Sequence, residues 1–130
     1  MVAKRVEDLK LWQRAVEFSN AVIAILDGPG FLRDRRLRAQ LSDAADSLVS
    51  NISEGFEQPT DRGFAKYLYD SKASTAEARA RLLLAKNKKY ISPEKQQELD
   101  QIGDEVARMT TGLIKYLLRS NRRDRGLGPR

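Results

Sequence analysis

Two carboxylate side chains in the middle of the chain have a spacing that could support chemistry. Asn51 and Glu54 are about one helical turn apart, and Ser74 and Glu77 repeat that spacing further along the sequence. Two carboxylates that flank a cleft could transfer protons or hold a divalent cation. The same residues could instead form a polar hydrogen-bond network that fixes helix register, with Glu77 pairing with Arg81. We favour the structural interpretation because no further catalytic group accompanies these residues.

The composition excludes most of the catalytic and metal sites that are known in helical proteins. The 130 residues include no cysteine and no histidine. Their absence removes the usual zinc sites, the histidine-containing triads and the Glu-x-x-His motif of di-iron bundles. We therefore expect no enzyme active site, no cofactor and no bound metal. A chain without cysteine also fits a reducing compartment, and no apolar segment is long enough for a signal peptide or a membrane span, so we expect a cytoplasmic protein.

Positive charge is concentrated in short segments of the chain. The formal net charge is +6, and residues 119–130 alone hold five arginines and one aspartate. Clustered cations can neutralise phosphates, although basic tails are often only solvated. A cluster of lysines at 86, 88 and 89 is explained by the preference for cations in the last turn of a helix. The candidate nucleic-acid contacts are Arg33, Arg35, Arg36 and Arg38, together with Arg119, Arg122, Arg123 and Arg125.

The spacing of apolar residues predicts four helices, over roughly residues 6–26, 34–56, 60–89 and 92–118. Asp34, Thr60 or Asp61, and Ser92 are the expected N-caps of the last three helices, and the glycines around Pro29 should end the first helix. Short connections between long helices favour antiparallel neighbours. We therefore predict an all-α fold, an antiparallel up-down-up-down four-helix bundle over residues 1–118, followed by a disordered basic tail over residues 119–130.

The positions of apolar residues predict a core face on the first helix and a second apolar surface that also includes residues of other helices. The expected core stripe consists of Val6, Leu9, Trp12, Ala15, Val16, Val22, Ile23 and Leu26. Within it, we expect Trp12 to be buried in the core or in a subunit interface rather than exposed for base stacking. A monomeric bundle has little use for apolar residues off its core stripes. Homo-oligomerisation is therefore favoured by the off-stripe residues Leu11, Phe18, Ile25, Val49 and Leu84.

The third predicted helix contains a run of small residues. Short side chains let a neighbouring helix approach closely. We therefore expect a tight helix contact at Ser71, Ala73, Ser74, Thr75, Ala76 and Ala78.

Three stretches of the chain resemble one known family. They are residues 8–15 (DLKLWQRA), residues 40–55 ending in SNISEG, and residues 64–77 ending in ASTAE. Together they are similar to the four-helix-bundle proteins encoded in intervening sequences of bacterial 23S ribosomal RNA genes, also called the S23 ribosomal protein family. The resemblance runs over almost all of residues 6–118, and the Asn-Ile-x-Glu-Gly segment is its most specific part. Ala73 stands where that family more often has glycine.

The resemblance implies a cytosolic bundle that forms a ring-shaped homopentamer, without an established enzymatic activity. A more distant relative is the accessory variability determinant of diversity-generating retroelements, a basic pentameric bundle that binds nucleic acid and a reverse transcriptase. The leading hypothesis is thus a non-enzymatic homo-oligomeric scaffold. The alternative is an accessory protein that binds RNA or DNA and partners a reverse transcriptase.

Overall fold

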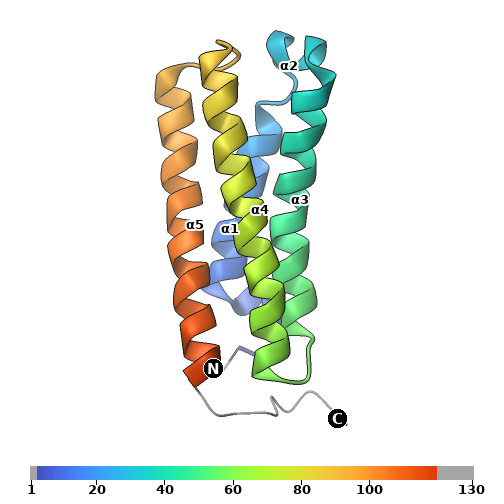
Figure 1. The fold of residues 1–130 in the computed structure, drawn as a ribbon, viewed down its shortest axis with the longest axis vertical. Helices are drawn as coiled ribbons and strands as arrows, with labels where there is room; N and C mark the ends of the chain where they lie inside the picture. The colour runs from blue at the N-terminus through green and yellow to red at the C-terminus, as the bar shows by residue number, and fades with distance from the viewer. Residues whose placement is uncertain (1–2, 120–130) are drawn as a thin grey trace.

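The computed structural model describes residues 3–119, and every element in this range is helical (Figure 1). This confirms the predicted all-α fold with four long helices. The elements are η1 (Val6–Asp8), α1 (Lys10–Ala24), α2 (Pro29–Arg33), α3 (Arg35–Phe56), α4 (Asp61–Asn87) and α5 (Pro93–Arg119).

The four long helices form a four-cornered bundle in which consecutive long helices run in opposite directions (Figure 1). α1 packs against α3 and α5, and α4 also packs against α3 and α5, so α1 and α4 occupy opposite corners. The short helix α2 lies at the upper end of the bundle in Figure 1, near the connection between α4 and α5. Within residues 3–119, no helix is both long and apolar enough to span a membrane.

Three side-chain caps define where the longer helices begin. Asp34 accepts a hydrogen bond from the Leu37 amide at 3.1 Å, and Thr60 accepts one from the Gly63 amide at 3.0 Å. The Ser92 hydroxyl accepts from the amide of Lys95, also at 3.0 Å. Each cap satisfies an amide that has no partner inside the helix. All three predicted N-caps are confirmed.

The core-facing stripe of α3 agrees with its sequence pattern throughout. The buried apolar side chains of this helix are Leu37, Leu41, Ala44, Ala45, Leu48, Ile52 and Phe56. On α4 the buried positions include Phe64, Leu68, Ser71, Thr75, Ala78, Leu82 and Ala85, which recur at alternating four- and three-residue steps. α5 buries Leu99, Val106 and Leu117, whereas Ile102, Met109 and Leu113 are partly buried beside them.

The predicted core stripe of the first helix is confirmed in part. Leu9, Ala15, Val22 and Leu26 are buried as predicted, whereas Ile23, which was also placed on the stripe, is 39% exposed. Leu11 and Phe18, which the sequence pattern placed off the stripe, are 4% and 0% exposed. Together with Ala15 and Val22 they recur at four- and three-residue steps, so they belong to the same buried face of α1.

A second correction concerns the segment that follows α1. Pro29 was expected only to terminate a helix, yet it occupies the first turn of α2, where proline's fixed φ suits the helix and its missing amide is no loss. Phe31 is fully buried and packs edge-on against the Tyr90 ring, with centroids 5.4 Å apart. Gly30 allows this approach, because a Cβ at that position would overlap the Tyr90 ring.

Small residues bring α3 and α4 into close contact, as the run of serine, threonine and alanine predicts. The buried Ser71 hydroxyl donates a 2.7 Å hydrogen bond to the Leu48 carbonyl on α3. Further down, a Cβ on Gly55 would lie 2.8 Å from both Phe64 Cδ1 and Tyr67 Cβ. Ala73 and Ala76, from the same run, are exposed and take no part in this contact.

Candidate functional site

Two of the four predicted polar residues, Asn51 and Ser74, lie at the contact between α3 and α4, and Ser47 connects them. The Asn51 side-chain amide donates to the Ser47 carbonyl at 3.0 Å and to the Ser47 hydroxyl at 3.1 Å, within α3. Ser74 donates to that same hydroxyl at 2.9 Å, across the interface. Ser47 was not among the predicted residues. The bond between Ser74 and Ser47 links α4 to α3, which is a structural role.

The two carboxylates lie apart from this hydrogen-bonded group. Glu54 and Glu77 are both exposed, and Glu54 lines a groove between α1 and α3. Within residues 3–119, Glu77 makes no ion pair with Arg81, whose buried Nε lacks a hydrogen-bond partner. The same range contains no group of three acidic residues that could hold a metal ion. The geometry therefore gives no support to carboxylate chemistry at Glu54 and Glu77.

Asp34 joins the start of α3 to the connection between α4 and α5. Its carboxylate caps α3 and accepts hydrogen bonds from Lys88 Nζ at 2.8 Å and from the Tyr90 hydroxyl at 2.9 Å. The Lys88 hydrogen bond, the Leu37 amide and the Tyr90 hydroxyl lower the pKa of Asp34 to about 2. The bond to Asp34 also raises the pKa of Lys88 and that of Tyr90. One side chain thus brings two basic segments of the sequence together.

The four predicted arginines of the first basic segment differ in their exposure and in their ion-pair and hydrogen-bond partners. Arg33, Arg35 and Arg36 are exposed, and none of them forms an ion pair within the described part of the chain. Arg38 is committed internally, since it donates to the Leu26 carbonyl at 2.9 Å and pairs with Asp27 at 3.2 Å. We call Arg33, Arg35, Arg36 and Lys88 the basic end of the bundle. Lys88 joins it only in the folded chain.

The second basic segment begins at the other end of the bundle. Arg119 is the last residue of α5, although the sequence assigned it to the tail, and its Nε donates to the Lys115 carbonyl at 3.2 Å. Because α5 runs the length of the bundle, Arg119 lies far from the basic end (Figure 1). The structure therefore places Arg119 apart from the arginines of the first basic segment. Arg122, Arg123, Arg125 and the rest of the predicted tail lie outside the described residues.

A groove between α1 and α3 is a feature that the sequence did not reveal. It is open to solvent, has a volume of about 430 Å³, and includes Val16, Val49, Asp46 and Glu54 in its lining. Ser53 lies at one end of it and accepts a 3.0 Å hydrogen bond from Trp12 Nε1. Trp12 itself is partly buried against the core. The two charged residues of the lining are both acidic.

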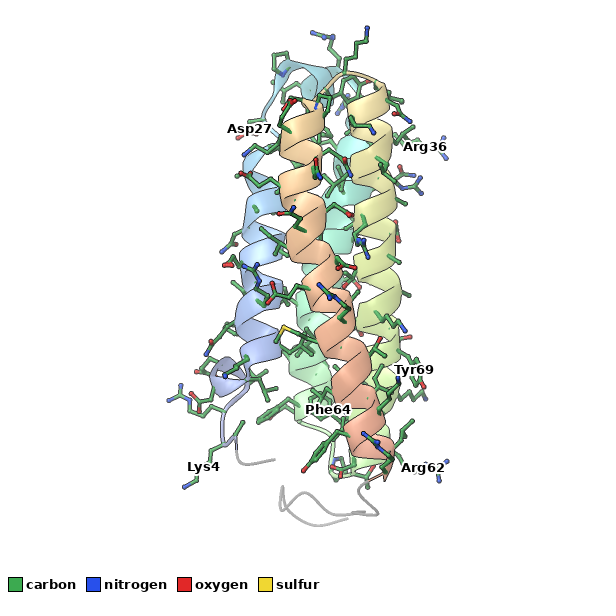
Figure 2. The ribbon with its side chains drawn as sticks, turned by 90° about the vertical axis from the view of Figure 1, so that its left-hand side faces the viewer. Lys4, Asp27, Arg36, Arg62, Phe64 and Tyr69 are labelled. Atoms are coloured by element: carbon green, nitrogen blue, oxygen red, sulfur yellow. The ribbon has the colours of Figure 1, made fainter. Side chains whose placement is uncertain are left out.

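The outer face of α4 is a second feature that the sequence analysis missed. It carries an apolar stripe at alternating four- and three-residue steps, formed by Tyr69, Ala73, Ala76, Ala80 and Leu83, all of them exposed. Tyr69 is 53% exposed and Leu83 is 45% exposed. Figure 2 shows Tyr69 on the outside of α4, whereas Phe64 lies in the interior. The spacing was a signal in the sequence, but the core stripe of the same helix has equal spacing.

The two edges of this outer face carry different charged residues. On the edge toward α5, Arg79 Nε pairs with Asp100 at 2.8 Å, and this hydrogen bond raises the pKa of Arg79. Lys72, two helical turns earlier on that edge, is exposed. The edge toward α3 carries Asp70 and Glu77, which flank Ser74 by one turn on either side, and Lys66, one turn before Asp70.

Comparisons with known proteins agree with this fold. The family model described as the 23S rRNA-intervening sequence protein matches residues 7–112. A crystal structure of a protein of unknown function from the S23 ribosomal protein family of Bacteroides thetaiotaomicron has a TM-score of 0.73 to this chain. It shares 18% sequence identity, and the alignment covers 81% of this chain and 98% of that one. No curated protein matches the chain.

Proposed function

We propose that this chain, which belongs to the 23S rRNA-intervening sequence protein family, is a non-enzymatic helical scaffold that assembles from several copies of itself. The observation that supports this proposal is the apolar outer face of α4. A stripe with alternating three- and four-residue spacing is the pattern by which one helix packs along another. On a monomer it would leave Tyr69 and Leu83 in water. Five copies in a ring is the stoichiometry that the family resemblance implies.

Leu11 and Phe18 do not support assembly, because both side chains belong to the core of the bundle. Among the other residues cited for it, Ile25 and Val49 are partly buried and Leu84 is 37% exposed. The case for assembly now depends on α4, whose outer stripe replaces those residues as the second apolar surface.

The test is the mass of the full chain in solution. Sedimentation equilibrium at micromolar concentration should return a multiple of the 14.7 kDa chain mass. Ala76→Arg, which puts a charge in the centre of the outer stripe, should reduce the mass to that of one chain while helical circular dichroism is retained. Gln97→Arg, at an exposed position on α5, is the matched control and should leave the mass unchanged. A wild-type mass of a single chain would contradict the proposal.

The second candidate function is nucleic-acid binding, and the folded basic end supports it. Arg33, Arg35, Arg36 and Lys88 come from two distant parts of the sequence and gather at one end of the bundle. In an assembly whose bundles run parallel, the same end of every copy would face the same side, which multiplies weak phosphate contacts. By resemblance to the accessory variability determinant, a reverse transcriptase would be the protein partner in this role.

The experiment for this candidate compares two ends of the bundle. Replacing Arg33, Arg35 and Arg36 together with glutamine should weaken binding to single-stranded RNA at low salt. It should also flatten the plot of log affinity against log salt by roughly 0.7 for each lost phosphate contact. Arg62→Gln is the control, since Figure 2 shows Arg62 at the opposite end from Arg36. Equal effects of the triple and control variants, or no binding by wild type, would rule out the basic end as the binding surface.

A further inference from the structure

We infer that the outer face of α4 in one copy docks into the groove between α1 and α3 of the next copy, with all helices parallel. The inference rests on the proposed self-assembly and specifies the two surfaces that meet. They are different surfaces, so the contact is heterologous, and its repetition by rotation can close a ring.

The two surfaces lie at the same level along the bundle. Ser74 on α4 bonds to Ser47 on α3, Ser71 bonds to the Leu48 carbonyl, and Gly55 lies against Phe64. These contacts place the groove-lining part of α3, residues 46–54, beside residues 64–74 of α4. Two copies related by a rotation about an axis parallel to the helices therefore present Tyr69 at the height of the groove. No shift along the axis is needed, so the contact can close rather than form an open filament.

The shapes of the surfaces suit each other. The stripe on α4 is narrow because its centre consists of alanines, and Tyr69 projects from it as the largest side chain at groove level. The groove is concave, and Val16 and Val49 line it from α1 and α3. A tyrosine ring in such a groove buries its apolar body while its hydroxyl reaches polar lining residues such as Ser50. Buried tyrosines of this kind are typical anchors of protein interfaces.

The charged residues of the two surfaces favour this contact between the groove and the outer face of α4. Asp46 and Glu54 are exposed on the groove, and neither is engaged in an ion pair within residues 3–119. Lys72, three residues after Tyr69 on the edge toward α5, is likewise exposed and forms no ion pair within residues 3–119. Lys66, Asp70 and Glu77 lie together on the edge toward α3. The edge that carries Lys72 can therefore enter the groove while the edge toward α3 stays at its margin. Opposite potentials across an interface fix orientation and exclude the wrong partner surface.

The experiment is a charge exchange between the two surfaces, followed by sedimentation. Lys72→Glu alone and Glu54→Lys alone should each raise the concentration needed for half assembly by at least about tenfold, because each places like charges together. An equimolar mixture of the two variants should assemble at a lower concentration than either variant alone. In the mixture, Glu at position 72 of one variant can meet Lys at position 54 of the other, and the reverse contact is wild type. A ring of five then needs to keep only one contact between two copies of the same variant.

Tyr69→Ala and Leu83→Ala form a matched pair of apolar truncations on the same helix face. Tyr69→Ala should abolish assembly at micromolar concentration, whereas Leu83→Ala should change it less than about threefold, because Leu83 lies above the level of the groove. Lys115→Glu, at an exposed position on α5, is the control for a charge reversal elsewhere. All variants change exposed residues, and circular dichroism checks their helix content.

The outcomes separate this inference from the proposed self-assembly. A wild-type mass of one chain would defeat both. Wild-type assembly that persists in Glu54→Lys but is lost in Tyr69→Ala would overturn the groove as the docking surface and indicate that two α4 helices pack on each other. Assembly that is insensitive to Tyr69 and Lys72 would overturn the inference and leave self-assembly standing.

Discussion

The inner and outer faces of α4 have the same apolar spacing but different environments. The inner face combines large side chains, such as Phe64 and Leu82, with Ser71 and Thr75, whose hydroxyls are hydrogen-bonded. The outer face has alanines between Tyr69 and Leu83, and no helix within residues 3–119 covers it. The difference teaches that spacing shows how many faces a helix can pack, whereas side-chain size and hydrogen bonding show which face is packed within the chain.

The two faces should differ most in the free energy of unfolding that is lost when a leucine is truncated, and two adjacent leucines allow the comparison. Leu82→Ala should lower the free energy of unfolding by about 2–5 kcal/mol, because it removes a fully buried side chain and leaves a cavity. Leu83→Ala should change it by less than about 0.5 kcal/mol, because that side chain is largely in solvent. Urea denaturation of both variants at one protein concentration measures the contrast. Similar losses would mean that the outer face is covered as fully as the inner one.

Gly55→Ala tests how tightly the inner face packs. The added methyl group would lie 2.8 Å from Tyr67 Cβ, an atom anchored to the backbone. We expect a loss of about 1–3 kcal/mol from this overpacking, which exceeds the gain of about 1 kcal/mol in helix propensity. Gly112→Ala is the control, since a Cβ there has nothing within 4 Å, and it should stabilise the helix by up to about 1 kcal/mol. Thermal unfolding that ranks the two variants the other way would contradict the tight contact.

Ser71→Ala should have a smaller effect on the same contact. It removes a buried hydrogen bond to the Leu48 carbonyl, which corresponds to about 0.5–1.5 kcal/mol of stability. Ser74→Ala should cost less, because its bond to Ser47 is only partly buried and water can replace it. Urea titration of the two variants side by side decides the order.

The smallest expected effect is a pH dependence of stability near the end of α4, where the Asp34 carboxylate accepts hydrogen bonds from Lys88 and Tyr90. The pKa of Asp34 is lowered to about 2 in the folded chain, from an ordinary value of 3.8. The folded state is therefore favoured by the ionised carboxylate above pH 4, and this contribution disappears as the pH falls toward 2. The melting temperatures of wild type and Asp34→Asn should differ at pH 6 and converge near pH 2. A constant difference across that range would show that Asp34 contributes nothing by its charge.

Much of the fold could be predicted because its signals are local. Asp34, Thr60 and Ser92 mark helix starts through side chains that reach only three residues along the chain. The face of α1 was predicted only in part, because apolar residues lie on more than one side of this helix. Leu11 and Phe18 belong to the buried face with Ala15 and Val22, whereas Ile23 is exposed.

The candidate surfaces were harder to predict because they combine distant segments. The groove needs Val16 and Val49 on neighbouring helices, and the basic end needs Lys88 to be held by Asp34 from 54 residues away. The stripe on α4 was present in the sequence. Its alanines at positions 73 and 76 were assigned to the contact with α3, because residue type alone does not show which face of a helix a small residue occupies.

The hydrogen bond from Trp12 to Ser53 has a consequence for experiments on folding kinetics. The chain contains one tryptophan, and this bond links it to a serine 41 residues away. Indole emission therefore reports on the moment at which α1 attaches to α3, separately from the helix formation that far-ultraviolet dichroism follows. Contacts between the consecutive helices α3, α4 and α5 close short loops, whereas the attachment of α1 to α5 joins the two ends of the chain. Stopped-flow fluorescence that lags behind dichroism would identify the attachment of α1 as the late step.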